Sequence, residues 1–156
     1  MADFMESIND GLNAAKKADE NKNEINSVFD ELNFQLGKAT NGTAKVIRRA
    51  FSKEINTTTY ASIAAKMIGE SLLNQQRETY LALAISHVNK EYNFNDVEIA
   101  KWNIDKNGYP CVITLRSVEL YCEDKEALEK ALSELMRDPD VGTAVFNCMN
   151  FKPRAK

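Results

Sequence analysis

The sequence contains few of the residues that usually carry out catalysis. Its 156 residues include one histidine, one tryptophan, three prolines and three cysteines. No segment matches a nucleophile elbow, a phosphate-binding loop, a dinucleotide fingerprint or a helical zinc-protease motif. The single histidine, His87, has no neighbour whose spacing suggests an acid–base pair. We therefore expect a non-enzymatic protein with no catalytic residues and no cofactor.

The three cysteines form neither a disulfide framework nor a metal-binding pattern. Their number is odd, and the spacings between Cys111, Cys122 and Cys148 match no CxxC or Cys/His arrangement. Each cysteine lies in an apolar stretch of the chain. We therefore expect three buried free thiols and no metal site.

Long apolar runs are also missing. No segment approaches the roughly 18 consecutive apolar residues that span a bilayer, and the first six residues lack the basic region and apolar core of a signal peptide. The remaining composition is typical of globular proteins, with 44% hydrophobic residues, 28% charged residues and a net charge of −3. We expect a cytoplasmic protein without a membrane partner.

The chain does contain a long amphipathic pattern over its first 36 residues. Apolar residues recur there near helical spacing: Met5, Ile8, Leu12, Ala15, Ala18, Ile25, Phe29, Leu32 and Leu36. Gly11 and Lys22 weaken the first half of this stripe, and the Gly/Thr/Asn cluster at residues 37–43 predicts its end. We expect residues 1–37 to form a helix or arm, and residues 38–156 to form a single α+β domain.

Two main roles are open for this helix, and docking to a different protein is a third alternative. It can cover the sheet of its own chain, or it can pair with a second copy, because Ile25, Phe29, Leu32 and Leu36 have the 4-3-4 spacing of a coiled coil. A break at residues 21–23, which would give a helical hairpin, is a further alternative. We predict that these four residues form the seam of a homodimer, and that changing two of them to Asp gives a monomer.

This prediction describes a small accessory or regulatory protein that self-associates and binds another macromolecule. The combination of small size, acidic charge and helices on a small sheet broadly resembles accessory proteins of bacteria and phages. No motif supports that likeness, so it implies no particular partner.

Charge changes sign after the helix. Residues 1–37 contain eight acidic residues and three lysines, whereas residues 38–66 contain six basic residues and one acid. Lys45, Arg48, Arg49 and Lys53 fall within nine residues and are the candidate contacts to nucleic acid, with a strong dependence on salt. The opposing interpretation is a solvated face, or pairing with the acidic helix.

A Mg²⁺-dependent nuclease is a third hypothesis. Asp96, Glu98 and Lys101 lie near one predicted strand, with Glu119 on the next, and two carboxylates with a lysine would suit a metal ion and a phosphate. Glu98 and Lys101 are three residues apart, which predicts opposite faces of a regular strand. The match to nuclease spacing is therefore poor.

Local patterns predict the α+β class, with further helices on one face of a small, mainly antiparallel sheet. Residues 96–104 and 109–121 flank Asn107-Gly108 and predict a hairpin. Residues 123–137 predict a helix and residues 141–149 a strand. Residues 44–55 fit either a short helix or a strand, residues 60–72 predict a helix, and residues 77–92 favour a helix over a strand.

Overall fold

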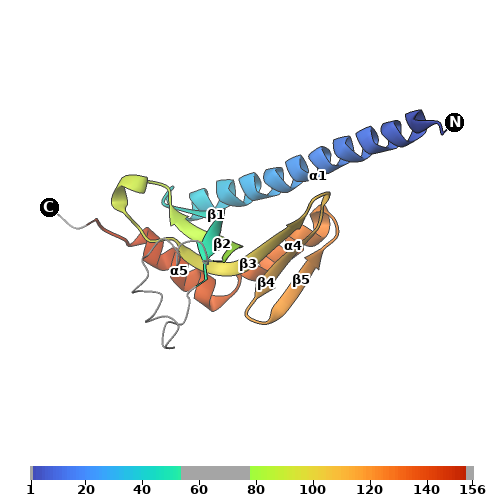
Figure 1. Cartoon of the computed structure of the whole chain (residues 1–156). Helices are drawn as coiled ribbons and strands as arrows, with labels where there is room; N and C mark the ends of the chain where they lie inside the picture. Colours follow the sequence, from blue (N-terminus) through green and yellow to red (C-terminus); the bar gives the residue numbers. More distant parts are fainter. Residues whose placement is uncertain (1, 54–77, 154–156) are drawn as a thin grey trace, which may run out of the picture.

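The structure, a computed structural model, describes residues 2–53 and 78–153. Its elements are α1 (Phe4–Ala39), β1 (Ala44–Ser52), β2 (Thr79–His87), the 3-10 helix η1 (Lys90–Tyr92), β3 (Val97–Asp105), β4 (Gly108–Leu115), β5 (Val118–Cys122), α4 (Lys125–Met136) and α5 (Pro139–Met149). The strands form an antiparallel sheet in chain order (Figure 1). The predicted α+β class is confirmed; the helix predicted over residues 60–72 lies outside the described residues.

Helix α1 runs without a break for 36 residues. The Asp3 carboxylate caps its start by accepting a hydrogen bond from the Met5 N–H at 3.0 Å. At its end the Thr40 N–H and hydroxyl both donate to the Leu36 carbonyl, and Asn41 and Gly42 turn the chain with φ values of 54° and 75°. The predicted end of the helix is confirmed. The alternative of a helical hairpin with a break at residues 21–23 is wrong, because the helix is continuous there.

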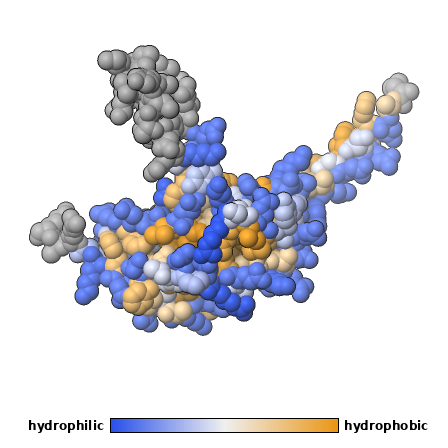
Figure 2. Space-filling model, turned by 90° about the horizontal axis from the view of Figure 1, so that it is seen from below, coloured by the Kyte–Doolittle hydropathy of each residue, from blue (hydrophilic) through white to orange (hydrophobic). Residues whose placement is uncertain are grey.

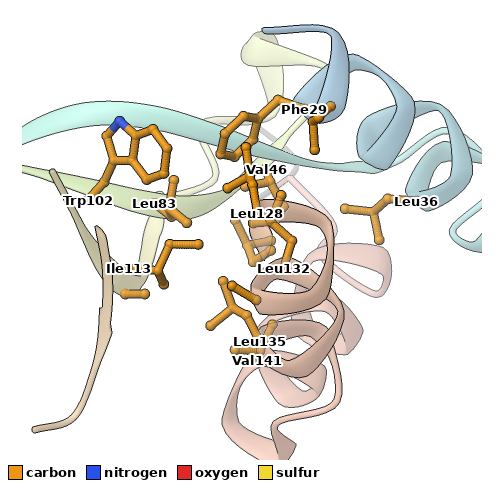
Figure 3. Packing of buried hydrophobic residues seen from close by; sticks show 14 of the residues in the cluster. Phe29, Leu36, Val46, Leu83, Trp102, Ile113, Leu128, Leu132, Leu135 and Val141 are labelled. Carbon is orange, nitrogen blue, oxygen red and sulfur yellow. The ribbon is translucent and has the colours of Figure 1, made fainter. Parts of the chain in front are cut away.

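One face of the sheet carries the core, which the second half of α1 covers together with α4 and α5. Figure 3 shows Leu83, Trp102 and Ile113 directed from the strands towards side chains of these helices. The Phe29 ring meets the Trp102 indole edge-to-face, with ring centroids 5.3 Å apart. The core thus fixes the position of the second half of α1.

The Asn33 side chain attaches α1 to the edge strand β1. Its Oδ1 accepts a hydrogen bond from the Val46 N–H at 2.7 Å, and its Nδ2 donates to the Val46 carbonyl at 2.9 Å. The backbone N–H and C=O of Val46 are therefore both hydrogen-bonded to the single side chain of Asn33.

Residues 77–92, for which a helix was favoured, contain strand β2 instead. Four consecutive side chains of this strand, Ala82, Leu83, Ala84 and Ile85, are fully buried. A strand buried on both faces shows a continuous apolar run rather than alternation. Ala82 and Ala84 lie on the face opposite the core, between Arg49 and Lys101 and between Ile47 and Glu98 respectively.

The strand predicted over residues 141–149 is wrong, because this segment belongs to helix α5. Asp138 caps its start by accepting from the Asp140 and Val141 N–H groups, and Pro139 occupies the first turn. Asp138 and Pro139 therefore separate α4 from α5 and also begin α5. The predicted hairpin and the helix over residues 123–137 are confirmed, but residues 109–121 form two strands, β4 and β5.

All three cysteines are buried free thiols, as predicted. Cys111 and Cys122 are paired across β4 and β5, and the Cys111 thiol donates to the Cys122 carbonyl at 3.9 Å. The neighbouring Cys122 side chain and burial raise the pKa of the Cys111 thiol. We expect negligible reaction with a thiol reagent such as Ellman's reagent in the native protein, and three equivalents in denaturant. Rapid reaction of one native thiol would contradict this packing.

Candidate functional site

The first half of α1 extends beyond the domain as an arm, defined here as residues 4–20 (Figure 1). Ala18 is half-buried, and every other residue of the arm is exposed. Contact with the domain begins at Asn21, whose Nδ2 donates to the Asn107 carbonyl at 2.9 Å, and continues with the hydrogen bond from the Tyr109 hydroxyl to Glu24 at 2.8 Å. Seventeen helical residues make the arm about 25 Å long.

The arm exposes four large apolar side chains. The exposed fractions are 68% for Phe4, 63% for Met5, 54% for Ile8 and 64% for Leu12. Helical geometry places them on one side of the arm, and Figure 2 shows hydrophobic side chains along its outer part. A contiguous exposed apolar stripe of this kind usually marks an interaction surface.

The predicted dimer seam lies elsewhere on α1. Ile25, Phe29 and Leu36 are buried against the chain's own sheet and helix α4, and Leu32 is half-buried beside them. This is the arrangement expected of a helix that covers its own sheet. These side chains are therefore not available at the surface, and self-association stays a prediction that has to involve other residues.

The exposed stripe of the arm is not a straight continuation of this buried face. At about 100° per residue, the centre of the exposed stripe lies roughly a quarter to a third of a turn around α1 from the centre of the buried face. The arm therefore presents its apolar side chains in a different direction from the half that packs on the sheet.

The four predicted basic contacts do not share one surface, because β1 is a strand and alternates its side chains. Arg48 lies on the helical side, with its guanidinium 4.4 Å from the centre of the Phe29 ring and donating to Asn26 at 2.9 Å. Burial lowers the pKa of Arg48, and the Asp30 carboxylate opposes that shift. Lys53 pairs with Glu78 at 3.1 Å.

Lys45 and Arg49 project from the other face of β1 and line a pocket of about 480 Å³ with the loop of residues 88–96. Arg49 forms an ion pair with Asp96 at 2.7 Å, and its guanidinium also lies 4.6 Å from the centre of the Phe51 ring. Lys90 from η1 contributes a further cation to this pocket. The structure therefore brings together two of the four predicted cations with one that was not predicted.

Sequence reasoning missed Lys90 and the asparagines beside it, because a helix was favoured over residues 77–92 and left no loop there. His87, at the end of β2, is buried and accepts a hydrogen bond at Nδ1 from the Asn89 N–H at 2.9 Å. Its ring packs against Tyr92, with ring centroids 4.6 Å apart. The density of asparagine over residues 89–95 was the available signal for this loop.

The residues of the nuclease hypothesis lie on the sheet face opposite the core. A β-bulge in β3 pairs Glu98 with Ala84 and Lys101 with Ala82, so these two residues share a face despite their spacing of three. The expectation of opposite faces was wrong for this reason.

These acidic residues are engaged with neighbouring side chains. Glu98 accepts from the Tyr80 hydroxyl at 3.1 Å, and Glu119 accepts from the Tyr121 hydroxyl at 2.7 Å. Asp96 is tied to Arg49. Within residues 2–53 and 78–153, no group of three or more His, Cys, Asp or Glu side chains is placed to hold a metal ion.

Compared with known proteins, the chain matches no family model, no curated protein and no solved structure. No described helix has both the length and the apolar character needed to cross a membrane. The arm and the pocket are the candidate functional surfaces of the described residues.

Proposed function

We propose that this protein is a non-enzymatic cytoplasmic accessory protein that self-associates through its arm and binds a macromolecular partner as a homodimer. One observation supports the association step above all. Phe4, Met5, Ile8 and Leu12 are each more than half exposed on a helix that has left its own domain. Covering them in a partner would remove a substantial apolar area from water.

The small residues of the arm favour a second copy as the occupant. When two arms lie antiparallel, Ile8 comes level with Ala15 of the other copy, Met5 with Ala18, and Leu12 with Gly11. Large side chains then pack beside small ones at three successive levels, which allows two helices to approach closely. The packing is poorest at the ends, where Phe4 comes level with Asp19.

Charge favours the same orientation. The acidic residues Asp3, Glu6 and Asp10 lie in the outer half of the arm, and Lys16 and Lys17 follow them. A parallel pair would bring every charged residue of the arm level with its own copy, whereas the antiparallel pair brings Glu6 level with Lys17 of the other copy. Asp3 then lies level with Glu20, the one like-charged level that remains. The Coulomb energy is therefore lower for the antiparallel pair.

Association through the arm also has a low ordering cost. The second half of α1 is fixed by the core, so the arm extends a helix that is already nucleated. A surface that is ordered before binding loses less conformational entropy when it binds.

The first test measures mass in solution by light scattering and sedimentation at micromolar concentration. We expect a dimer for the wild type, and we expect Ile8→Glu combined with Leu12→Glu to weaken dimerisation by about 100-fold or more. Phe34→Glu is the matched control, because Phe34 is also an exposed apolar residue of α1 but lies outside the arm. A monomeric wild type, or equal effects of both variants, would overturn the proposal.

Orientation is tested by cross-linking. A mixture of Ile8→Cys and Ala15→Cys proteins is expected to form disulfides between the two variants, because the native thiols are buried. A parallel pair would instead link like variants. That result would leave the dimer intact and reject the antiparallel arrangement.

A further inference from the structure

The pocket between β1, the end of β2 and the loop of residues 88–96 is independent of the arm. Three cations line it: Lys45 and Arg49 from β1, and Lys90 from η1. Asp96 is the only acidic residue among the described side chains that line it. The pocket walls therefore carry a net charge of +2 in a protein whose overall charge is −3.

The charges of the pocket are unequally neutralised. The Asp96 carboxylate is 18% exposed and is paired with Arg49 at 2.7 Å. Neither Lys45 nor Lys90 forms an ion pair with any residue that the structure describes. The two ammonium groups are thus the uncompensated charges at this site, and an anion placed between them would gain attraction without displacing an existing ion pair.

Neutral hydrogen-bond groups complete the wall. Asn89, Asn93 and Asn95 line the pocket from the loop, and Ser86 lines it from β2. Amide and hydroxyl groups can donate hydrogen bonds to phosphate oxygens beside the charged lysines. Ile47 and Phe94 are the apolar contributors, so the lining is suited to a polar ligand.

The loop is held in place before any ligand arrives. The Asn89 side chain accepts a hydrogen bond from the Glu91 N–H at 3.0 Å and caps η1. The Asn89 N–H donates to His87, whose ring packs on Tyr92. On the opposite wall, Asp96 and the Phe51 ring fix the Arg49 guanidinium. Preorganised walls reduce the entropic cost of binding.

We propose that this pocket binds the phosphate group of a small phosphorylated molecule, with Lys45 and Lys90 as the principal charge contacts. A volume of about 480 Å³ holds more than a phosphate ion and is in the usual range for small-ligand pockets. The cations surround one hollow and do not extend along a strip. A compact phosphomonoester fits this arrangement better than the repeated phosphates of a nucleic acid.

The test is titration calorimetry of the full chain at low ionic strength with four probes: inorganic phosphate, glucose 6-phosphate, glucose and a single-stranded oligonucleotide. We expect saturable binding of glucose 6-phosphate that is at least 10-fold tighter than that of inorganic phosphate, and no binding of glucose. Combining Lys45→Gln with Lys90→Gln is expected to weaken binding at least 10-fold. An unchanged melting temperature would show that this variant is folded.

Lys101→Gln is the matched control, because Lys101 is an exposed cation on the same sheet face but does not line the pocket. This variant is expected to bind as the wild type does. The proposal is overturned if neither phosphate probe binds at millimolar concentration, or if Lys101→Gln weakens binding as much as the double variant. It is also overturned if the oligonucleotide binds more tightly than glucose 6-phosphate.

Discussion

Replacing Ile25 with aspartate is expected to unfold the domain and not to release a folded monomer. Ile25 is fully buried in the same core cluster as Phe29 and Trp102. Truncating a buried isoleucine to alanine costs about 2–5 kcal/mol, and an unpaired buried carboxylate costs more. The total is comparable with the whole stability of a typical domain. Far-UV circular dichroism and urea denaturation would measure the loss.

Leu12→Asp is the matched control for this experiment. Leu12 lies on the same helix but is 64% exposed, so at a concentration at which both proteins are monomeric the same chemical change is expected to leave the stability of the domain within about 0.5 kcal/mol of wild type. If Ile25→Asp remained folded and changed only the mass in solution, then residues 25–36 would form an interface between copies after all. The pair of variants therefore separates the two roles that the sequence left open for α1.

The second large effect is expected from Gly108→Ala, in the turn between β3 and β4. Gly108 has a φ of +92°, and a Cβ there would lie 2.7 Å from the Asn21 Cβ and 3.3 Å from two backbone atoms of α1. The Asn21 Cβ is attached directly to the backbone of α1 and cannot move away by itself, so α1 or the turn has to move. We expect a loss of about 2–4 kcal/mol in the free energy of unfolding, measured in urea.

Gly42→Ala separates the clash from the backbone strain. Gly42 also has a positive φ, at +75°, but a Cβ there would meet no atom within 4 Å. This variant is expected to lose about 1 kcal/mol. Equal losses at the two positions would show that α1 does not press against the turn. A larger loss at Gly108 supports a rigid junction between the arm and the domain.

Local signals in the sequence were sufficient for several elements. Asn107-Gly108 marked the first hairpin, and the end of α1 coincided with its Gly/Asn cluster. Strand β2 was missed because its alanines favour a helix by intrinsic propensity, which outweighed the alternation of Leu81, Leu83 and Ile85. Helix α5 was missed although Asp138 and Pro139 form a pair that caps the start of a helix. Both errors concern signals whose meaning depends on tertiary context.

The candidate functional surfaces were harder to predict from the sequence than the helices and strands. A helical stripe looks the same whether it meets the chain's own sheet or solvent, and only the position at which the domain ends separates Leu12 from Ile25. Strand alternation divided Arg48 from Lys45 and Arg49, and a bulge brought Glu98 and Lys101 to one face. The face on which each of these side chains lies depends on how the strands pair, and the spacing of residues along the sequence does not determine that pairing.

The contact between Asn33 and Val46 affects whether a strand of another molecule can pair with the edge strand β1. The exposed edge of a β-sheet is a template on which a foreign strand can grow. A primary amide carries the same donor and acceptor as a peptide unit, and Asn33 presents both to the outer edge of β1. Helix α1 thus occupies the place of the next strand at this point. At Val46 the edge of β1 is therefore closed to a foreign strand by the helix whose other half extends beyond the domain.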